Sequence, residues 1–449
     1  MLICRPSHGF RPFWRERTRA ISTSTILSAE VKRSDVPLVF LHGMKGSHLS
    51  SPMSRQWIYL SGLLNLPPKP DHDPSRDLSL PMRYNDMVQV SGDLKPDGLV
   101  NFIVDVNGYL QFLPFYGHIS CVLNDLDAAY KTRTKPQDNI TSCTTRPTAC
   151  FVYDWRRDLL ELSDAFHRFC CESFPDRPVQ VLAHSMGGLI ALSAMRRYPE
   201  KYRPGAVMAG VPFGTGIQYL QDLHLGYFTE LGRCRQFLPE SQFTFSSHWC
   251  FFPTSSETLG DAFVDVTHMP EITFEANVPS IGKNLGKEFR EEPVRGKPIQ
   301  IDFYDVDDWE KHGIGIFSKG MDEGTLEVYK NHMRVQIARA LEFRIAALGF
   351  EKPHEDIPPL AVGASNTKPT INQILRRTNK SGGFDYDYCS GRSVPGDGRI
   401  NFTGAFPLVR HKAFELQSLH AKQFIWEDHG GDLGTLLRKV EEQLATYLS

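Results

Sequence analysis

The sequence predicts an α/β protein whose mostly parallel sheet is flanked by helices on both faces. Short, continuous runs of branched apolar residues recur along the chain, and segments with helical periodicity follow them. Such runs are typical of strands that are buried on both faces of a sheet. Strands that alternate with helices indicate parallel pairing, because each helix carries the chain back to the edge where the next strand begins. The 449 residues are enough to bury a large core around this sheet.

The elements follow one another from near Asp35, where the folded part is expected to begin. VPLVFLHG is the first buried-strand segment, and VQVLAHS is followed directly by the helix-forming segment MGGLIALSAMRR. A long helix is expected from Thr325 to Leu348, because apolar residues recur there at helical spacing. In chain order, the expected strands are 36–43, 148–158, 178–185, 204–214, 358–365 and 421–431, and the main helices are 159–173, 186–202, 325–348 and 433–448.

The regular alternation stops after the fourth strand, which predicts one sheet domain interrupted by an inserted cap. Residues 35–214 are expected to form the first part of the core, 215–320 the cap and 321–449 the second part of the core. A lid is expected at 48–68. Trp57 and its apolar neighbours in this lid are candidates for contact with lipid or a membrane surface, or for packing in the core.

Residues 1–34 are expected to be a leader outside the fold, disordered or used for targeting. Five arginines and a single glutamate in the first 29 residues, together with serine and threonine, are typical of a mitochondrial transit peptide, although a disordered leader of no address has the same composition. The apolar run of a secretory signal is missing there, and the sequons at Asn139, Asn379 and Asn401 favour secretion only weakly. An intracellular location, mitochondrial or cytosolic, is therefore slightly favoured over secretion.

Composition and motifs exclude several classes of protein. Lys+Arg is 50 and Asp+Glu 52, so the formal net charge of -2 argues against a nucleic-acid surface. The sequence has no stretch of 18 apolar residues, so a membrane-spanning helix is not expected. The nine cysteines lack the spacing of a zinc site, and a single bridge, such as Cys143 with Cys150, remains open. No phosphate-binding loop or HExxH motif occurs, so neither a metal nor an organic cofactor is expected.

Ser185 lies where the strand 178–185 turns into a helix. A serine hydroxyl becomes nucleophilic only when a base takes its proton, and it must also project into the substrate space. A sharp strand-to-helix turn achieves this and requires small residues around it, here Ala183 and Gly187. Ala183 departs mildly from the usual G-x-S-x-G pattern. Ser185 is therefore predicted to be a catalytic nucleophile, the alternative being a structural turn serine.

Acyl transfer also needs two backbone N–H groups that face the developing oxyanion. One is expected from Met186, which follows the nucleophile. The other is expected from the loop HGMKG after the first strand, with Met44 as its donor. The alternative interpretation of His42 and Gly43 is a simple turn at the end of a strand.

The acid and the base of a Ser-Asp-His triad should follow later in the chain, in that order. Asp397 lies between two glycines in SVPGDGRI, after the strand 358–365, and is the predicted acid. His429 lies in EDHGGDL, between the last strand and the last helix, and is the predicted base. The competing candidates are His184 and His420 for the base, and Asp385, Asp387 and Asp428 for the acid.

These motifs together resemble the lecithin:cholesterol acyltransferase family, which includes phospholipid:diacylglycerol acyltransferases and related phospholipases. The resemblance rests on FLHGMKGS, YDWRRDL, AHSMGGLIA, GVPFGTGIQ, DDWEKHGIGIF, SVPGDGRI and EDHGGDL in this order, and it covers roughly residues 36–445. It implies an α/β-hydrolase fold with a cap and a lid, and acyl chains taken from lipid esters. The family's triad falls on Ser185, Asp397 and His429.

The chain departs from the family pattern at three places. His42-Gly43 stands where the family often has Pro-Gly, and Arg399 replaces the threonine after GDG. The cysteine pair that closes the lid of secreted members is missing between Gly46 and Leu80. These departures bear on the acyl acceptor and on lipid preference more than on the triad.

The segment YDWR has two interpretations. Tyr153, Asp154, Trp155 and Arg156 are candidates for substrate binding, with Trp155 against a lipid head group and Arg156 on its phosphate. Equally, the two aromatic residues belong to a core and Arg156 to a structural ion pair.

The expected function is that of a lipid O-acyltransferase, which moves a fatty acyl group from a phospholipid to a sterol or diacylglycerol type of alcohol through an acyl-enzyme. A phospholipase A or lipase would use the same triad with water as the acceptor. A non-catalytic lipid-binding relative is the alternative from another class. The expected partners are the phospholipid donor, an alcohol or water, and a transient lipid surface.

Overall fold

The computed structural model describes most of the region from residue 32 to residue 406 and one later strand. The described residues are 32–50, 55–57, 78–82, 94–100, 102–106, 110–114, 116–132, 144–214, 216–228, 235–253, 262–269, 292–348, 358–364, 366, 368–406 and 422–425. Residues 1–31 of the leader, most of the predicted lid and the predicted helix 433–448 lie outside this part of the chain.

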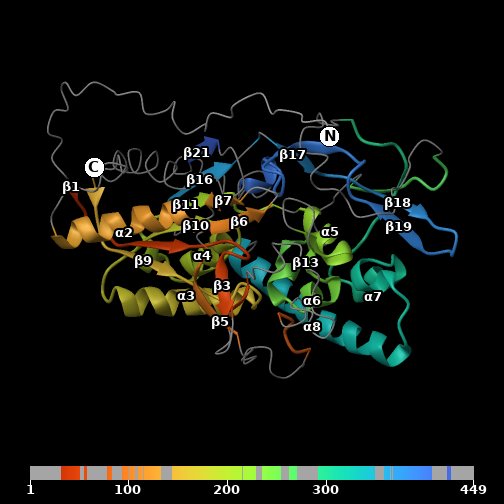
Figure 1. Ribbon diagram of the computed structural model, residues 1–449, viewed down its shortest axis with the longest axis horizontal. Coiled ribbons are helices and arrows are strands. Elements are labelled where there is room, and N and C mark those ends of the chain that lie inside the picture. The colour runs from red at the N-terminus through yellow and green to blue at the C-terminus, as the bar shows by residue number, and fades with distance from the viewer. Residues whose placement is uncertain are drawn as a thin grey trace, which may run out of the picture.

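A six-stranded parallel sheet forms the centre of the molecule (Figure 1). All of its neighbouring strands pair in parallel, which confirms the prediction from the alternating pattern. Each strand lies within one of the six predicted segments. In spatial order they are β21 (Lys422–Ile425), β16 (Leu360–Ala364), β11 (Ala206–Ala209), β10 (Gln180–His184), β2 (Leu38–Leu41) and β9 (Thr148–Phe151).

Helices cover both faces of this sheet, and alternate strand residues face opposite layers. Leu38 and Phe40 of β2 pack with α2 (Gly117–Thr132) on one face. Val39 and Leu41 belong to the larger core on the other face, with α3 (Leu159–Ser173), α4 (Met186–Arg197) and α8 (Glu323–Leu348). Figure 1 shows α2 and α3 on opposite sides of the strands. Because both faces are covered, the strands require the continuous apolar runs seen in the sequence.

The predicted helices 159–173 and 325–348 are confirmed as α3 and α8. The start of α3 is stabilised by Asp158, whose side chain accepts a hydrogen bond of 3.0 Å from the Glu161 N–H. This contact satisfies one of the amide groups that the first turn of a helix leaves without an intrahelical partner.

Shorter elements surround the central sheet. The helical turns η2 (Pro199–Tyr202) and η5 (Thr403–Ala405) lie in its connections. The paired short strands are β1 (Lys32–Arg33) with β8 (Thr144–Thr145), β3 (Ser47–Ser50) with β4 (Arg55–Trp57) and β5 (Lys95–Leu99), β6 (Phe102–Val106) with β7 (Leu110–Pro114), and β17 (Lys368–Ile371) with β20 (Ser393–Gly396).

The predicted cap segment folds into short helices and strands beside one end of the sheet (Figure 1). Its own sheet has the order β15-β14-β18-β19 and takes strands from both sides of the predicted boundary at residue 320. The elements are α5 (Gln218–Leu225), β12 (Tyr227–Phe228), β13 (Arg235–Phe237), α6 (Pro239–Phe243), η3 (Ser246–Phe251), β14 (Phe263–Asp265), β15 (Lys297–Pro298), α7 (Val306–Lys311), η4 (Gly315–Ser318), β18 (Ile374–Thr378) and β19 (Phe384–Asp387).

Aromatic side chains fill the interior of the cap. Trp249 and Trp309 meet edge to face with ring centroids 5.4 Å apart, and Phe252 stacks on Phe303 at 5.0 Å. All four side chains are buried. Aromatic pairs of this geometry add about 0.5–1.5 kcal/mol beyond the burial of their surface. The cap is therefore a packed body that can hold nearby loops in place.

The described residues bear on the expectations about membranes, metals and disulfides. None of the described helices combines the length and apolar character needed to cross a bilayer. The described histidine, cysteine and acidic side chains form no group of three or more that is arranged to hold a metal ion. Cys150, one half of the bridge that the sequence leaves open, is a free thiol.

Candidate active site

Ser185 occupies the sharp turn between β10 and α4. Its φ of 52° and ψ of −129° lie in a backbone region that residues other than glycine rarely adopt. The strand register holds this conformation, because the Ser185 N–H donates to the Ala209 carbonyl of β11 over 2.8 Å. The backbone at Ser185 therefore has the strained turn that a nucleophile on this kind of strand-to-helix connection needs.

Two glycines allow the helix after Ser185 to lie against the sheet. A Cβ atom on Gly187 would lie 2.4 Å from the His42 carbonyl oxygen, and one on Gly188 would lie 2.2 Å from Cγ2 of Val211. Ala183 belongs to β10 and is fully buried in the core. The departure from the usual glycine thus lies in a regular strand, which accepts a methyl group.

Replacing Gly187 by alanine is expected to destabilise the fold by about 3 kcal/mol, because the clash is with backbone that cannot rotate away. Urea unfolding of both proteins measures this difference. Gly320→Ala is the matched control, since a Cβ at Gly320 would meet nothing within 4 Å. Equal stability of Gly187→Ala and wild type would show that the turn is looser than its geometry indicates.

The loop after β2 lies directly against Ser185. A Cβ on Gly43 would lie 2.7 Å from the Ser185 Cβ and 3.3 Å from its Oγ. The Gly43 carbonyl accepts hydrogen bonds from His42 Nδ1–H at 2.7 Å and from the Gly46 N–H at 3.2 Å. In a trans peptide the N–H points opposite to the C=O, so these bonds turn the Met44 N–H away from the His42 ring.

Met186 is the other predicted oxyanion donor, and it is the first residue of α4. The first amide groups of a helix have no intrahelical acceptor, and the helix dipole makes this end favourable for negative charge. The structure therefore leaves the Met186 amide without a partner inside α4. Its role as an oxyanion donor remains a prediction, as does that of Met44.

Asp397 lies in the turn after β20, and it is buried. Its Oδ1 accepts hydrogen bonds from the N–H groups of Arg399 and Ile400, each at 2.7 Å. The following turn is tied to the loop after β11, because the Gly214 N–H donates to the Gly404 carbonyl over 2.7 Å. The carboxylate is thus held by backbone in one orientation, which suits a residue that orients a base.

A partly buried ion cluster joins the Met44 loop to the Asp397 loop. Lys45 Nζ lies 3.6 Å from Asp222 Oδ2, and Arg399 Nη1 lies 3.2 Å from Asp222 Oδ1. The Lys45 ammonium also lies 3.1 Å from the ring centroid of Tyr227. Burial lowers the pKa of Lys45 to about 7, although the charge of Asp222 opposes this shift. The α5 carboxylate of Asp222 therefore connects two loops that each carry a predicted site residue.

Several predicted residues lie outside the described part of the chain. His429 is among them, together with the competing candidates His420 and Asp428. Trp57 ends strand β4, and the structure describes only its backbone. The other histidine candidate, His184, is buried and joined to the Tyr116 hydroxyl by a hydrogen bond of 2.6 Å.

The four YDWR side chains are all buried and contact other parts of the protein. Arg156 binds the Asp154 carboxylate through two nitrogens, at 2.9 and 2.7 Å, and donates to the Leu78 carbonyl. Trp155 donates to the Ser47 carbonyl over 3.2 Å, and the Tyr153 hydroxyl donates to the His42 carbonyl over 2.5 Å. These contacts agree with the interpretation in which the aromatic residues belong to the core and Arg156 to a structural ion pair. A role of the four residues in substrate binding remains a prediction.

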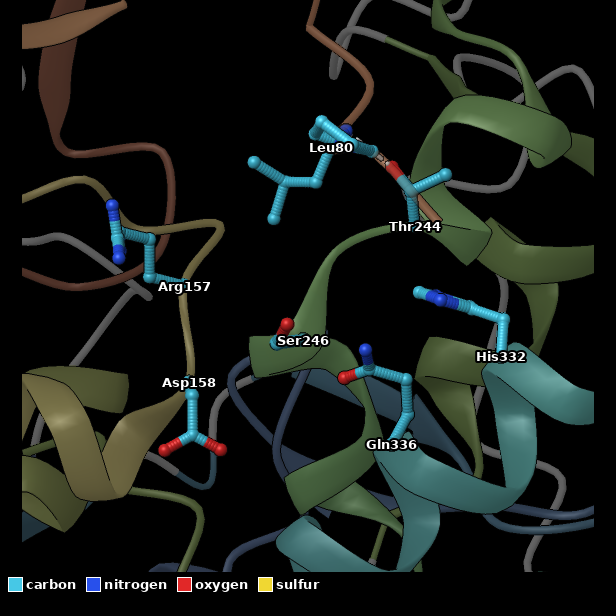
Figure 2. Close-up of a pocket in the computed structure, with 8 residues that line it drawn as sticks. Leu80, Arg157, Asp158, Thr244, Ser246, His332 and Gln336 are labelled. Carbon is cyan, nitrogen blue, oxygen red and sulfur yellow. Dashed lines mark hydrogen bonds between the residues drawn. The ribbon is translucent and has the colours of Figure 1, made fainter. Parts of the chain in front are cut away.

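A small cavity lies beside the end of this segment (Figure 2). Its volume of about 10 Å³ is enough for one water molecule. Asp158 and Arg157 line one side, and His332 and Gln336 of α8 line the other. Its described lining residues include neither Ser185 nor Asp397, and neither Met44 nor Met186.

His332 makes the fold sensitive to acid. Burial lowers its pKa to about 4, because the charged imidazolium would lose its hydration there. Between about pH 4 and 6.5 the unfolded chain binds a proton that the folded chain does not, so stability falls as the pH falls through this window.

We expect His332→Leu to remove this contribution. The difference in unfolding free energy between wild type and His332→Leu should shift by about 2 kcal/mol in favour of the variant from pH 7 to pH 5. Urea unfolding at both pH values measures it, and the exposed His268→Leu is the control. A difference that is the same at both pH values would contradict the prediction.

Sequence reasoning missed three residues that contact the candidate site. Tyr116 and Asp222 each contact the HGMKG loop from more than 70 positions away, and neither belongs to a motif. His42 was noted only as part of a turn. Its ring stacks on Tyr153 at 4.0 Å, and burial lowers its pKa to about 4, so the neutral ring can donate from Nδ1 and accept at Nε2.

Comparison with known proteins bears on the fold and the class of chemistry. The sequence model of a family described as serine aminopeptidase, S33, matches residues 150–255, which contain β10, Ser185 and α4. One chain in the crystal structure of the Tle4–Tli4 complex is 12% identical, with a TM-score of 0.51, over 92% of this chain and 99% of that chain. The protein has an α/β-hydrolase fold.

A second solved structure, a candidate aryl esterase from Burkholderia cenocepacia, is 10% identical over 92% of both chains, with a TM-score of 0.31. No curated protein matches the chain significantly. The family match and the Ser185 turn together support an α/β-hydrolase enzyme of the serine-hydrolase type. They do not specify an acyltransferase or a lipid substrate.

Proposed function

We propose that this α/β-hydrolase is a lipid esterase that forms an acyl-enzyme on Ser185 and passes the acyl group to an alcohol or to water. The observation that carries the proposal is the strained turn at Ser185, whose side chain faces the loop at Gly43. A buried serine on such a turn, opposite a glycine loop and at a helix N-terminus, suits nucleophilic attack on an ester carbonyl.

The proposed reaction has two half-reactions with the same groups. His429, oriented by Asp397, accepts the Ser185 proton while the oxygen attacks the ester carbonyl, and the N–H groups of Met44 and Met186 bind the oxyanion. The lyso-lipid leaves with the proton from His429, and the acyl group stays on Ser185. An alcohol or water then gives its proton to His429 and attacks this ester. The Ser185 oxygen leaves with that proton from His429, and the new ester or the free acid is released.

The proposed donor is a phospholipid and the proposed acceptor a sterol or diacylglycerol type of alcohol, on the basis of the resemblance to lecithin:cholesterol acyltransferases. Hydrolysis is the second candidate, and the similarity of residues 150–255 to a serine aminopeptidase family favours it. The two candidates share the acyl-enzyme and differ only in the group that attacks it.

The test is incubation with phospholipid labelled in its acyl chain, with and without sterol or diacylglycerol, followed by separation of the products. A new ester establishes transfer, and free fatty acid in every mixture establishes hydrolysis. An aminoacyl p-nitroanilide provides the peptidase arm and is expected to give no turnover. If a fluorophosphonate fails to label Ser185 and none of the substrates is consumed, the protein is a binding protein and the proposal is wrong.

A further inference from the structure

Two buried tyrosines hold a single peptide group of the loop that faces Ser185. This peptide joins His42 to Gly43. Its N–H donates to the Tyr116 hydroxyl over 2.7 Å, and its carbonyl oxygen accepts from the Tyr153 hydroxyl over 2.5 Å. The two hydroxyls therefore bind opposite sides of one peptide plane.

The tyrosines reach this peptide from different parts of the fold and have little freedom to move. Tyr116 precedes α2, and its ring packs edge to face on Phe40 with centroids 5.4 Å apart. Tyr153 follows β9, and its ring stacks with that of His42 at 4.0 Å and with that of Phe151 at 5.4 Å. Both side chains are at most 2% exposed. Hydroxyls fixed in this way can fix the peptide that they bind.

The orientation of this peptide bears directly on the predicted oxyanion donor. The next peptide, between Gly43 and Met44, is held by the His42 ring through its bond to the Gly43 carbonyl. The same ring accepts the Tyr153 N–H at Nε2 over 3.3 Å. With both peptides around Gly43 held, the direction of the Met44 N–H follows, because a trans peptide is rigid.

The hydrogen bonds around this peptide also reach the residue next to the nucleophile. The Tyr116 hydroxyl and His184 Nδ1 are 2.6 Å apart in a hydrogen bond, and His184 directly precedes Ser185. The other atom near the turn is the His42 carbonyl oxygen of this peptide, which would lie 2.4 Å from a Cβ on Gly187. The His42–Gly43 peptide is thus linked through Tyr116 to the residue before Ser185, and its carbonyl oxygen lies close to Gly187 on the other side of the serine.

We propose that Tyr116 and Tyr153 are positioning residues that hold the oxyanion loop against Ser185, so that the Met44 N–H is in place before the transition state forms. The inference rests on the proposed function. Preorganised donors are effective because they need no reorganisation at the moment of reaction. Loss of either hydroxyl should therefore slow the chemical step and leave substrate binding nearly unchanged.

The test compares Tyr116→Phe, Tyr153→Phe and the double variant with wild type. Steady-state kinetics on a short p-nitrophenyl ester give kcat and KM, with active sites counted by a fluorophosphonate. Each single variant is expected to lower kcat about tenfold and to change KM less than about twofold, since removal of a whole oxyanion donor costs about 10²–10³ in kcat. The rate of phosphonylation of Ser185 should fall in parallel, because the fluorophosphonate also places an anionic oxygen next to the Met44 N–H.

Tyr202→Phe is the matched control. Tyr202 is also fully buried, and its hydroxyl also lies within hydrogen-bond distance of a histidine Nδ1, that of His167 at 3.2 Å, but it packs on Phe166 of α3. This control is expected to keep the wild-type kcat per labelled site. Thermal unfolding of all variants separates an effect on stability from an effect on the chemical step.

The double variant distinguishes a shared action from two separate ones. Because both hydroxyls bind the same peptide, the double variant should lose less than the product of the two single losses. The inference is wrong if both single variants keep the wild-type kcat per labelled site. It is also wrong if the loss of kcat in the double variant equals the product of the two single losses. If Tyr116→Phe does not fold, Tyr153→Phe decides alone. A wild-type protein that turns over no ester instead overturns the proposed function, and the inference falls with it.

Discussion

Ser185→Ala is expected to lower ester turnover by about 10⁵-fold or more, because no other group can then form the acyl-enzyme. The fold should remain, since alanine keeps the small side chain that the turn between β10 and α4 holds in its strained conformation. The measurement is kcat for a soluble ester together with labelling by a fluorophosphonate. Both signals should disappear together.

The matched control for this prediction is Ser193→Ala. Ser193 is also fully buried and lies two turns further along α4, where its hydroxyl cannot reach the Gly43 loop. It should keep wild-type turnover and labelling. A Ser185→Ala protein that still releases fatty acid from phospholipid would show that the nucleophile lies elsewhere.

Asp397→Asn is expected to lower kcat by about 10³–10⁴-fold, the second largest effect. The asparagine oxygen can still accept the N–H groups of Arg399 and Ile400, so the turn should keep its shape. What the variant loses is the negative charge that orients the base and stabilises its protonated form. Steady-state kinetics and thermal unfolding should therefore show a large loss of rate with little loss of stability.

Asp387→Asn provides an unusually close control. Its Oδ1 accepts the N–H groups of the residues two and three positions later, Cys389 at 2.7 Å and Ser390 at 3.0 Å, as Asp397 does. Asp387 was also one of the alternative candidates for the acid that the sequence offered. It lies on β19 of the cap sheet, and its variant should keep wild-type turnover. A rate loss in Asp387→Asn but not in Asp397→Asn would reverse the assignment.

The central sheet and the turn at Ser185 were predictable from local sequence. Apolar runs such as VPLVFLHG and PVQVLAHS each form one strand, and the parallel order follows from the helices between them. Gly187 predicted a crowded turn, because this constraint lies within a few residues of Ser185, and the structure places the position of its Cβ 2.4 Å from the His42 carbonyl oxygen. The turn at Asp397 was predictable for the same reason, since two glycines frame it after a strand, and its role as the acid remains a prediction.

The contacts around the Gly43 loop depend on packing between distant segments. Tyr153 was a candidate for lipid binding in the sequence, yet its hydroxyl binds the His42 carbonyl from 111 positions away. Arg399 was known only as a departure from a family pattern, and in the structure it shares Asp222 with Lys45 across 177 positions. Periodicity and motifs report on neighbours in the chain. Which buried hydroxyl or carboxylate reaches which loop follows from how the cap, α2 and β9 pack around the sheet, because a buried polar group must find a partner wherever the fold places one.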